Sequence, residues 1–183
     1  LFAQTSELLE IREIQVSGEH RVSKNEILAR AGYFSGMNAL QVNLEETRLA
    51  IEEILWIRHA TVRRVWPNQL AVSVVERTPV ALARIDSEIY LVDVDGFILP
   101  VDALTNTNFP ILDGLVALDE ERSVDANAFK ISIYQEALEV LGESQLSEVH
   151  VSDAGDVSVV PVDDAVVVDL GMVEHRIRWE KYL

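Results

Sequence analysis

The feature that most constrains the fold of this chain is a pair of helix-start signals within its first 80 residues. Ser23 stands three positions before Glu26, the spacing of a capping box, in which the Ser side chain accepts a hydrogen bond from the third helical N–H group. Asn43 and Glu46 repeat that spacing. Hydrophobic residues recur at helical intervals after both signals, and Gly32 is typical of the end of a helix. The sequence therefore predicts two short helices, one after each cap.

Alternating hydrophobic and polar residues flank these helices and indicate strands. One strand precedes the first helix, and two follow the second, at 59–65 and 69–77. Trp66–Gln69 is interpreted as a four-residue turn between those two, because Pro in its second position suits a type I turn. The order strand, helix, helix, strand, strand predicts a small unit with both helices on one sheet face. The residues expected to be buried between that sheet and its helices are Leu70, Val72, Val74, Ile14, Val16, Ile51 and Ile54.

The second half of the chain has weaker signals but the same mixture of elements. Strands are predicted at 80–84 and 89–94, with a turn at 94–97, and a helix at 126–142. Three β-rich segments then follow, at 148–152, 156–162 and 165–170, and a last helix begins near 173. The fold class expected for the whole chain is α+β, with a β-α-α-β-β domain before a mixed β-sheet domain with flanking helices.

The distribution of charge divides the chain at the same point. Residues 1–79 hold 9 basic and 10 acidic side chains, whereas residues 80–183 hold 6 and 21. A change of composition beside Pro79 predicts two domains, 10–79 and 80–183. The formal net charge of −16 disfavours nucleic acid as a partner, because such binding depends first on neutralising phosphates with Lys and Arg.

No motif indicates a catalytic, cofactor or metal site, and none of these is expected. There is no cysteine, the four histidines are scattered, and no phosphate-binding Gly-rich loop is present. Asp93-Val94-Asp95-Gly96 resembles part of a calcium loop, but Leu91 would occupy the first ligand position. A hairpin turn is the preferred interpretation there, and Asp163-Asp164 is likewise interpreted as a solvated turn. The arginines between Trp56 and Trp66 leave two alternatives open, a protein-binding surface or core tryptophans beside solvated arginines.

Several short motifs together resemble one protein family. In the first half the matching fragments are Ile14–Gly18, Ile27-Leu28, Asn43-Leu44, Trp56–Leu70 and Val74–Ala81. In the second half they are Leu91–Asp93, Asp95-Gly96, Leu99-Pro100, Pro110–Gly114 and Asp169–Gly171. The first set looks like a POTRA domain, and the whole order is similar to the FtsQ/DivIB family of bacterial cell-division proteins.

The resemblance implies a non-enzymatic scaffold of the division machinery. By this resemblance the full protein is a single-pass inner-membrane protein at the septum, with this region on the extracytoplasmic side, and its β domain binds FtsB and FtsL. A transmembrane helix is expected before Leu1, and further strands after Leu183. The alternatives are a POTRA module of an outer-membrane assembly or secretion protein, and an acidic hydrolase.

The resemblance also implies partner-binding residues in the first domain, at Val42, His59, Val62 and Arg64. Counting back from a four-residue turn places Val62 opposite Ser73 and Arg64 opposite Ala71, which predicts that both point away from the helices. A three-residue turn would shift the register by one position and make Val62 part of the core. His59 falls on the other face of the strand, so His59 and Val42 rest on the resemblance alone.

Overall fold

The computed structural model describes residues 7–32, 34–101, 108–117 and 121–182. The chain divides into two compact units, Leu1–Arg77 and Thr78–Leu183, and each unit has its own sheet. No helix within the described ranges is both long enough and apolar enough to cross a lipid bilayer.

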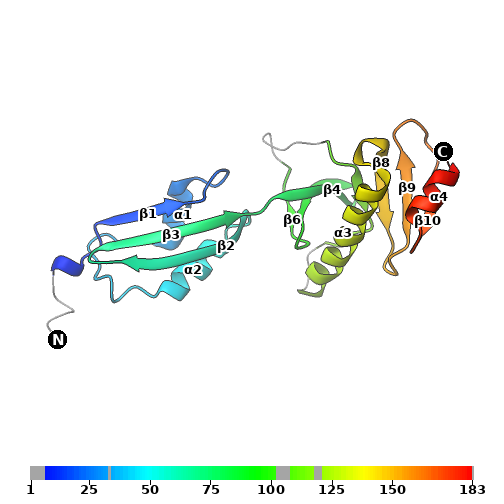
Figure 1. Cartoon of the computed structure of the whole chain (residues 1–183). Helices are drawn as coiled ribbons and strands as arrows, with labels where there is room; N and C mark the ends of the chain where they lie inside the picture. The colour runs from blue at the N-terminus through cyan, green and yellow to red at the C-terminus, as the bar shows by residue number, and fades with distance from the viewer. Residues whose placement is uncertain (1–6, 33, 102–107, 118–120, 183) are drawn as a thin grey trace. The chain divides into compact units, whose positions relative to one another are not determined.

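The first unit has the predicted order of strand, helix, helix, strand, strand (Figure 1). The strands lie in the order β1-β3-β2, with β1 parallel and β2 antiparallel to the central β3. The elements are η2 (Glu7–Leu9), β1 (Glu13–Ser17), α1 (Lys24–Ala31), α2 (Leu44–Glu52), β2 (Ile57–Val65) and β3 (Gln69–Glu76).

Both predicted helix caps are present. The Glu26 N–H donates to Ser23 Oγ at 3.2 Å, and the Glu46 N–H donates to Asn43 Oδ1 at 3.2 Å. Gly32 ends α1 with a φ of 103°, a backbone conformation that residues with a Cβ atom rarely adopt. The two starts are therefore determined locally, by side chains that satisfy the first free N–H groups of each helix.

The two helices cover the same face of this sheet. Ile27 of α1 and Ile51 of α2 are fully buried and share one cluster with Val72 and Val74 of β3. Leu70 is fully buried too, but it packs in an adjoining cluster near the start of β3. The prediction that β3 buries alternate residues is confirmed, whereas Ile14 and Val16, expected in the core, are only half-buried.

The second unit contains one mixed sheet of seven strands in the order β10-β9-β8-β7-β4-β5-β6. Neighbouring strands are antiparallel, except that β7 is parallel to both β4 and β8. The elements are β4 (Pro79–Ile85), β5 (Glu88–Asp93), β6 (Ile98–Leu99), β7 (Ile111–Asp113), α3 (Glu121–Leu141), η3 (Glu143–Gln145), β8 (Leu146–Val151), β9 (Val157–Pro161), β10 (Val168–Gly171) and α4 (His175–Tyr182).

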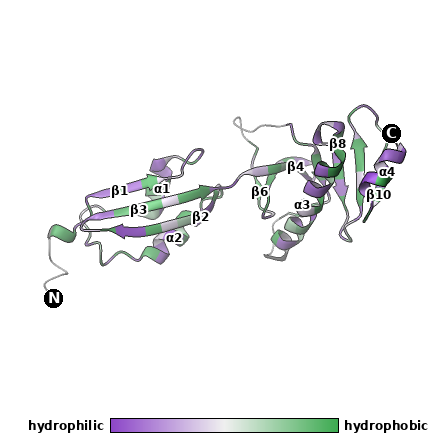
Figure 2. Ribbon diagram, viewed as in Figure 1, coloured by the Kyte–Doolittle hydropathy of each residue, from purple (hydrophilic) through white to green (hydrophobic). Residues whose placement is uncertain are grey.

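Helix α3 connects β7 to β8 and packs across one face of this sheet (Figure 1). Parallel neighbours need such a crossover, because a tight turn can join only antiparallel strands. Ile131, Tyr134 and Ala137 of α3 are fully buried against the sheet, and Trp179 of α4 belongs to the same cluster. In Figure 2 purple hydrophilic and green hydrophobic stretches alternate along α3, as expected of a helix that buries one side against a sheet.

Two predicted element starts in this unit were wrong by three residues or more, and one strand was missed. Helix α3 begins at Glu121 and not at Ala126, and β10 begins at Val168 and not at Ala165. The segment that contains Leu112 was not among the predicted strands, yet it is the middle strand β7. Three residues are too few to show a period of two, so this strand has no pattern of its own.

Candidate partner-binding surface

Strand β2 is an edge of the first sheet, since its neighbour in the described sheet is β3 on one side only. An edge strand presents main-chain N–H and C=O groups to which another strand can add. The end of β2 near the β2–β3 hairpin is also its most hydrophilic part (Figure 2), where Arg63 and Arg64 lie. Three of the four predicted binding residues lie on this strand: His59, Val62 and Arg64.

The predicted pairing of β2 with β3 was wrong by one residue. Val65 pairs with Gln69, Arg64 with Leu70, and Val62 with Val72, because the hairpin loop consists of three residues. Paired residues share a sheet face, so Val62 and Arg64 lie on the face that the helices cover. The prediction that they point away from the helices is therefore wrong.

Val62 is half-buried and packs against the cluster of the two helices. Its exposure differs from that of Ala60, which is fully buried two residues earlier on the same face. Val62 thus lies at the margin of the core. It contributes to packing and still has part of its side chain in solvent.

Arg64 holds the segment between the two helices. Its Nε donates to the Ala39 carbonyl at 2.6 Å, and its Nη2 donates to the Val42 carbonyl at 2.7 Å. The side chain of Val42 is 3% exposed and packs with Ile11, Ala39 and Leu70. The structure thus brings Val42 and Arg64 together, but through the main chain of Val42, whose side chain is part of the core.

His59 lies on the opposite, open face of the sheet, where it pairs with the exposed Val75. Its Nδ1 is 2.9 Å from Glu52 Oε1, and the same oxygen accepts the Ala60 N–H at 2.8 Å. Partial burial raises the pKa of Glu52, but the Ala60 N–H and the paired Arg48 outweigh this effect and hold the pKa below its usual value. The ionised carboxylate therefore links α2 to β2.

Glu52 is a residue of this surface that the sequence pattern did not identify. It falls on the polar side of α2, where a solvated Glu is the simplest expectation. Its bond to Ala60 also defines the free edge of β2. Because alternate residues of an antiparallel strand bond to the neighbour, the main-chain groups of Ala60, Val62 and Arg64 all point away from β3.

The acidic turns of the second unit have structural explanations. Asp93 is 1% exposed, and its Oδ1 accepts the N–H groups of Asp95 at 3.0 Å and of Phe97 at 2.9 Å. Asp164 accepts a hydrogen bond from the Tyr182 hydroxyl at 3.0 Å. Across the part of the chain that the structure describes, no three His, Asp or Glu residues are grouped in a way that could hold a metal ion.

Comparison with known families matches both units in order. Residues 9–77 match the model for the FtsQ-type POTRA domain, and residues 81–183 match the model for the C-terminal part of cell division protein FtsQ/DivIB. Together these models cover nearly all of the chain.

Individual proteins give the same result. A cell division protein FtsQ from Koribacter versatilis is 34% identical over 180 residues, which cover 93% of this chain and 51% of that protein. One from Syntrophotalea carbinolica is 32% identical over 171 residues, which cover 93% of this chain and 58% of that protein. In the FtsQ of Bordetella pertussis, 75 residues are 47% identical and correspond to 40% of this chain and 27% of that protein. The chain spans about half the length of the first two relatives, and it belongs to the FtsQ/DivIB family of bacterial cell-division proteins.

Proposed function

We propose that this chain is the extracytoplasmic region of a single-pass inner-membrane protein that acts at the division septum as a non-enzymatic scaffold. The observation that carries the proposal is the consecutive match of both units to one division-protein family. The match of the second unit separates this function from that of an outer-membrane assembly or secretion protein, since such proteins share only the POTRA module. FtsB- and FtsL-like proteins are the partners we propose for the scaffold.

For the first unit we propose that the free edge of β2 is the recruitment surface, and that a partner segment adds to it as a strand. A strand added to an edge contacts side chains from both sheet faces. This mode would allow the predicted binding residues to act from opposite faces, His59 from one and Val62 and Arg64 from the other. Val42 would act indirectly, through its carbonyl bond to Arg64.

Strand addition can be tested by removing one main-chain donor. The Val62 N–H points toward the free edge, so Val62→Pro removes a donor that β3 does not use. We expect this variant of the full-length, membrane-anchored protein to lose septal localisation, while the thermal midpoint of its purified extracytoplasmic region falls by only a few degrees. The matched control is Val62→Thr, which keeps the N–H group and the branched shape and should localise normally.

A second variant distinguishes the edge from the open face. Val75 is 54% exposed on the open face beside His59, so Val75→Glu changes that face and leaves the edge main chain intact. Normal localisation of Val75→Glu together with loss for Val62→Pro supports docking at the edge. The reverse result would mean that the partner covers the open face, and the edge proposal would be abandoned.

The scaffold function itself has a separate test. Cells depleted of the native protein should divide again when they express the full-length form, and FtsB- and FtsL-like proteins should copurify with it from membranes. Failure of both, with normal expression at the membrane, would remove the proposed function even if β2 still bound a strand in solution.

A further inference from the structure

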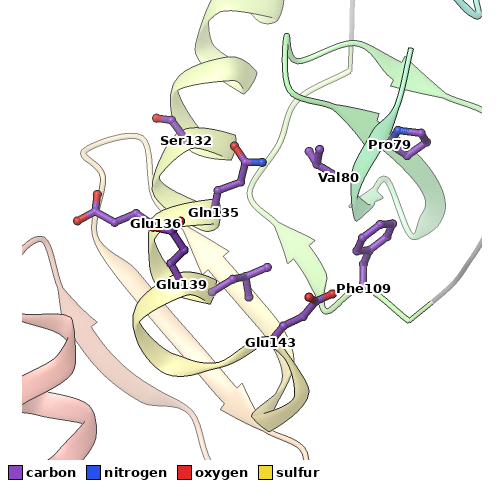
Figure 3. A pocket seen from close by; sticks show the side chains of 9 residues that line it. Pro79, Val80, Phe109, Ser132, Gln135, Glu136, Glu139 and Glu143 are labelled. Atoms are coloured by element: carbon purple, nitrogen blue, oxygen red, sulfur yellow. The ribbon is translucent and has the colours of Figure 1, made fainter. Parts of the chain in front are cut away.

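A groove of about 660 Å³ lies in the second unit, beside α3 (Figure 3). Pockets that bind ligands typically have volumes of roughly 300–1,000 Å³. One wall consists of Pro79 and Val80 at the start of β4 together with Phe109, and the opposite wall is α3, which contributes Gln135 and Leu138. In Figure 3 Gln135 points from the helix toward Val80, so the two walls face each other across the groove.

The wall formed by Val80 and Phe109 is held in place by contacts behind it. The ladder between β4 and β7 begins with the pair Leu82 and Ile111, and the parallel register continued backward places Val80 alongside Phe109. The buried Tyr134 hydroxyl of α3 donates to the Pro110 carbonyl at 2.9 Å. The groove is therefore formed by the folded unit before any partner arrives.

The groove has a strongly negative border. Glu136, Glu139 and Glu143 line it from α3 and from the turn just after it, and all three are exposed. In Figure 3 the Glu143 carboxylate lies on the side of Phe109, whereas Glu136 points away from Val80 and Phe109. No Lys or Arg is among the described residues that line the groove. The last turn of α3 has no basic residue either, so the negative end of the helix dipole adds to this field.

Two basic side chains of this unit, one on α3 and one on β4, are engaged away from the groove. Lys130 is 4% exposed and donates to the Gly114 carbonyl and to Asp153. Arg84 pairs with Glu148. Because residues 80–183 hold 21 acidic and 6 basic side chains, the wider surface reinforces the negative potential of the groove.

We propose that this groove binds a protein segment in which a large apolar side chain lies between Lys or Arg residues. The apolar lining takes the side chain out of water, and the carboxylates of Glu139 and Glu143 pair with the flanking cations. Anionic partners such as nucleic acids and acidic lipid surfaces would be repelled from the same border. The site belongs to the second unit and is independent of the edge of β2.

The test uses the 183-residue chain and two fluorescein-labelled peptides of 12 residues. One peptide combines Lys with Leu, and the second has the same Lys positions with Ser in place of each Leu. Binding is measured by fluorescence anisotropy at about 0.15 M salt, where the Debye length of about 8 Å suppresses attraction from distant charges. We expect the Lys/Leu peptide to bind at least tenfold more tightly than the Lys/Ser peptide.

Matched charge reversals locate the binding. The double variant Glu139→Lys/Glu143→Lys should weaken binding of the Lys/Leu peptide at least tenfold. The control Asp163→Lys/Glu180→Lys changes the net charge equally at exposed positions outside the groove and should weaken it less than twofold. Phe109→Ala, with its fold checked by thermal melting, should weaken binding of the Lys/Leu peptide and leave binding of the Lys/Ser peptide unchanged. Equal losses in the two double variants, equal affinity for the two peptides, or no binding of the Lys/Leu peptide would each overturn the proposal.

Discussion

The middle strands of the two sheets differ in how clearly their own sequence marks them as strands. In the first unit the middle strand β3 has eight residues, and alternate side chains from Leu70 to Val74 are buried against the covering elements. In the second unit the middle strand β7 has only three residues, between Pro110 and Gly114. Both central leucines, Leu70 and Leu112, are fully buried.

The difference teaches that a central position in a sheet does not require a strong strand signal. Strand β7 pairs in parallel with β4, which precedes it by about thirty residues, and with β8, which follows it after the crossover helix α3. Its place is decided by these distant neighbours. Strand β3, in contrast, shows its own period of two and pairs with β2 through a short hairpin.

The largest loss of stability should come from truncating the side chain in the middle of β7. Leu112→Ala removes a fully buried side chain from the cluster beneath α3, and we expect it to lower the free energy of unfolding of the second unit by about 2–5 kcal/mol. Trp179 lies in the second unit and Trp56 in the first. The fluorescence of two single-tryptophan forms can therefore follow the urea unfolding of each unit separately.

With Leu112→Ala the Trp179 transition should move to lower urea and the Trp56 transition should stay in place. An equal movement of both transitions would contradict the prediction that the domains divide beside Pro79. A change of less than about 0.5 kcal/mol in the free energy of unfolding would mean that β7 contributes little to stability, despite its central position in the sheet.

Leu70→Ala is the matching change in β3. Leu70 packs with Ile11, Ala39 and Val42 in a smaller cluster, where the surrounding segments between secondary-structure elements can relax into part of the space. We expect a loss near the lower end of the same range, about 2–3 kcal/mol, seen in the Trp56 transition. If Leu70→Ala cost more than Leu112→Ala, the strand with the stronger local pattern would also be the one that contributes more stability.

The sequence alone was sufficient for the fold of the first unit but not for the sheet faces of its predicted binding residues. The caps at Ser23 and Asn43 and the alternation of β3 are local signals, and each predicted element is present. The faces of Val62 and Arg64 depended on whether the hairpin loop has three or four residues. Pro67 suits either length, so only the three-dimensional pairing decided the register.

Contacts that cross long stretches of sequence were not predictable from the sequence either. Nothing in the sequence around Glu52 indicates that its carboxylate bonds to Ala60 and His59. The groove in the second unit likewise depends on Phe109 lying beside Val80, which follows from the parallel ladder. Local patterns identify elements, whereas sites formed between distant elements require the fold.

A smaller loss of stability should follow when the charge of Glu76, which holds the loop before α1, is removed. Glu76, at the end of β3, accepts the N–H groups of His20, Arg21 and Val22 at 2.8–3.0 Å. Partial burial raises the pKa of Glu76, but these hydrogen bonds outweigh it and hold the pKa below its usual value. Glu76→Gln should cost about 1–3 kcal/mol at pH 7, because hydrogen bonds to a charged acceptor are stronger than those to a neutral one.

The pH dependence gives this prediction its control. Since the folded pKa of Glu76 lies below the unfolded one, its stabilisation is present above an ordinary Glu pKa of about 4.3 and is lost as the pH falls through the folded value. The difference between wild type and Glu76→Gln in the Trp56 transition should therefore shrink between about pH 5 and pH 3. A difference that stays constant over this interval would show that the loss came from packing and not from charge.

The smallest loss of stability should come from breaking the ion pair that crosses above β7 on the face of the second sheet opposite α3. Arg84 of β4 pairs with Glu148 of β8 at 2.6 Å and lies 3.9 Å from Asp113 of β7, and the side chains of Arg84 and Glu148 are about one-third exposed. Pairs of this exposure contribute about 0–1 kcal/mol, because solvent and salt screen them. Arg84→Met should therefore lower the free energy of unfolding followed by Trp179 by less than about 1 kcal/mol. The loss should be smaller still at 1 M salt, where the Debye length is about 3 Å.

The matched change in the first unit is Arg30→Met, whose partner Glu53 is more exposed, and it should have no measurable effect on the Trp56 transition. A loss above about 2 kcal/mol for Arg84→Met would mean that the pair keeps β4 and β8 in register across a strand too short to do so alone. The middle of the second sheet would then depend on a charged pair on its surface as well as on Leu112 beneath it.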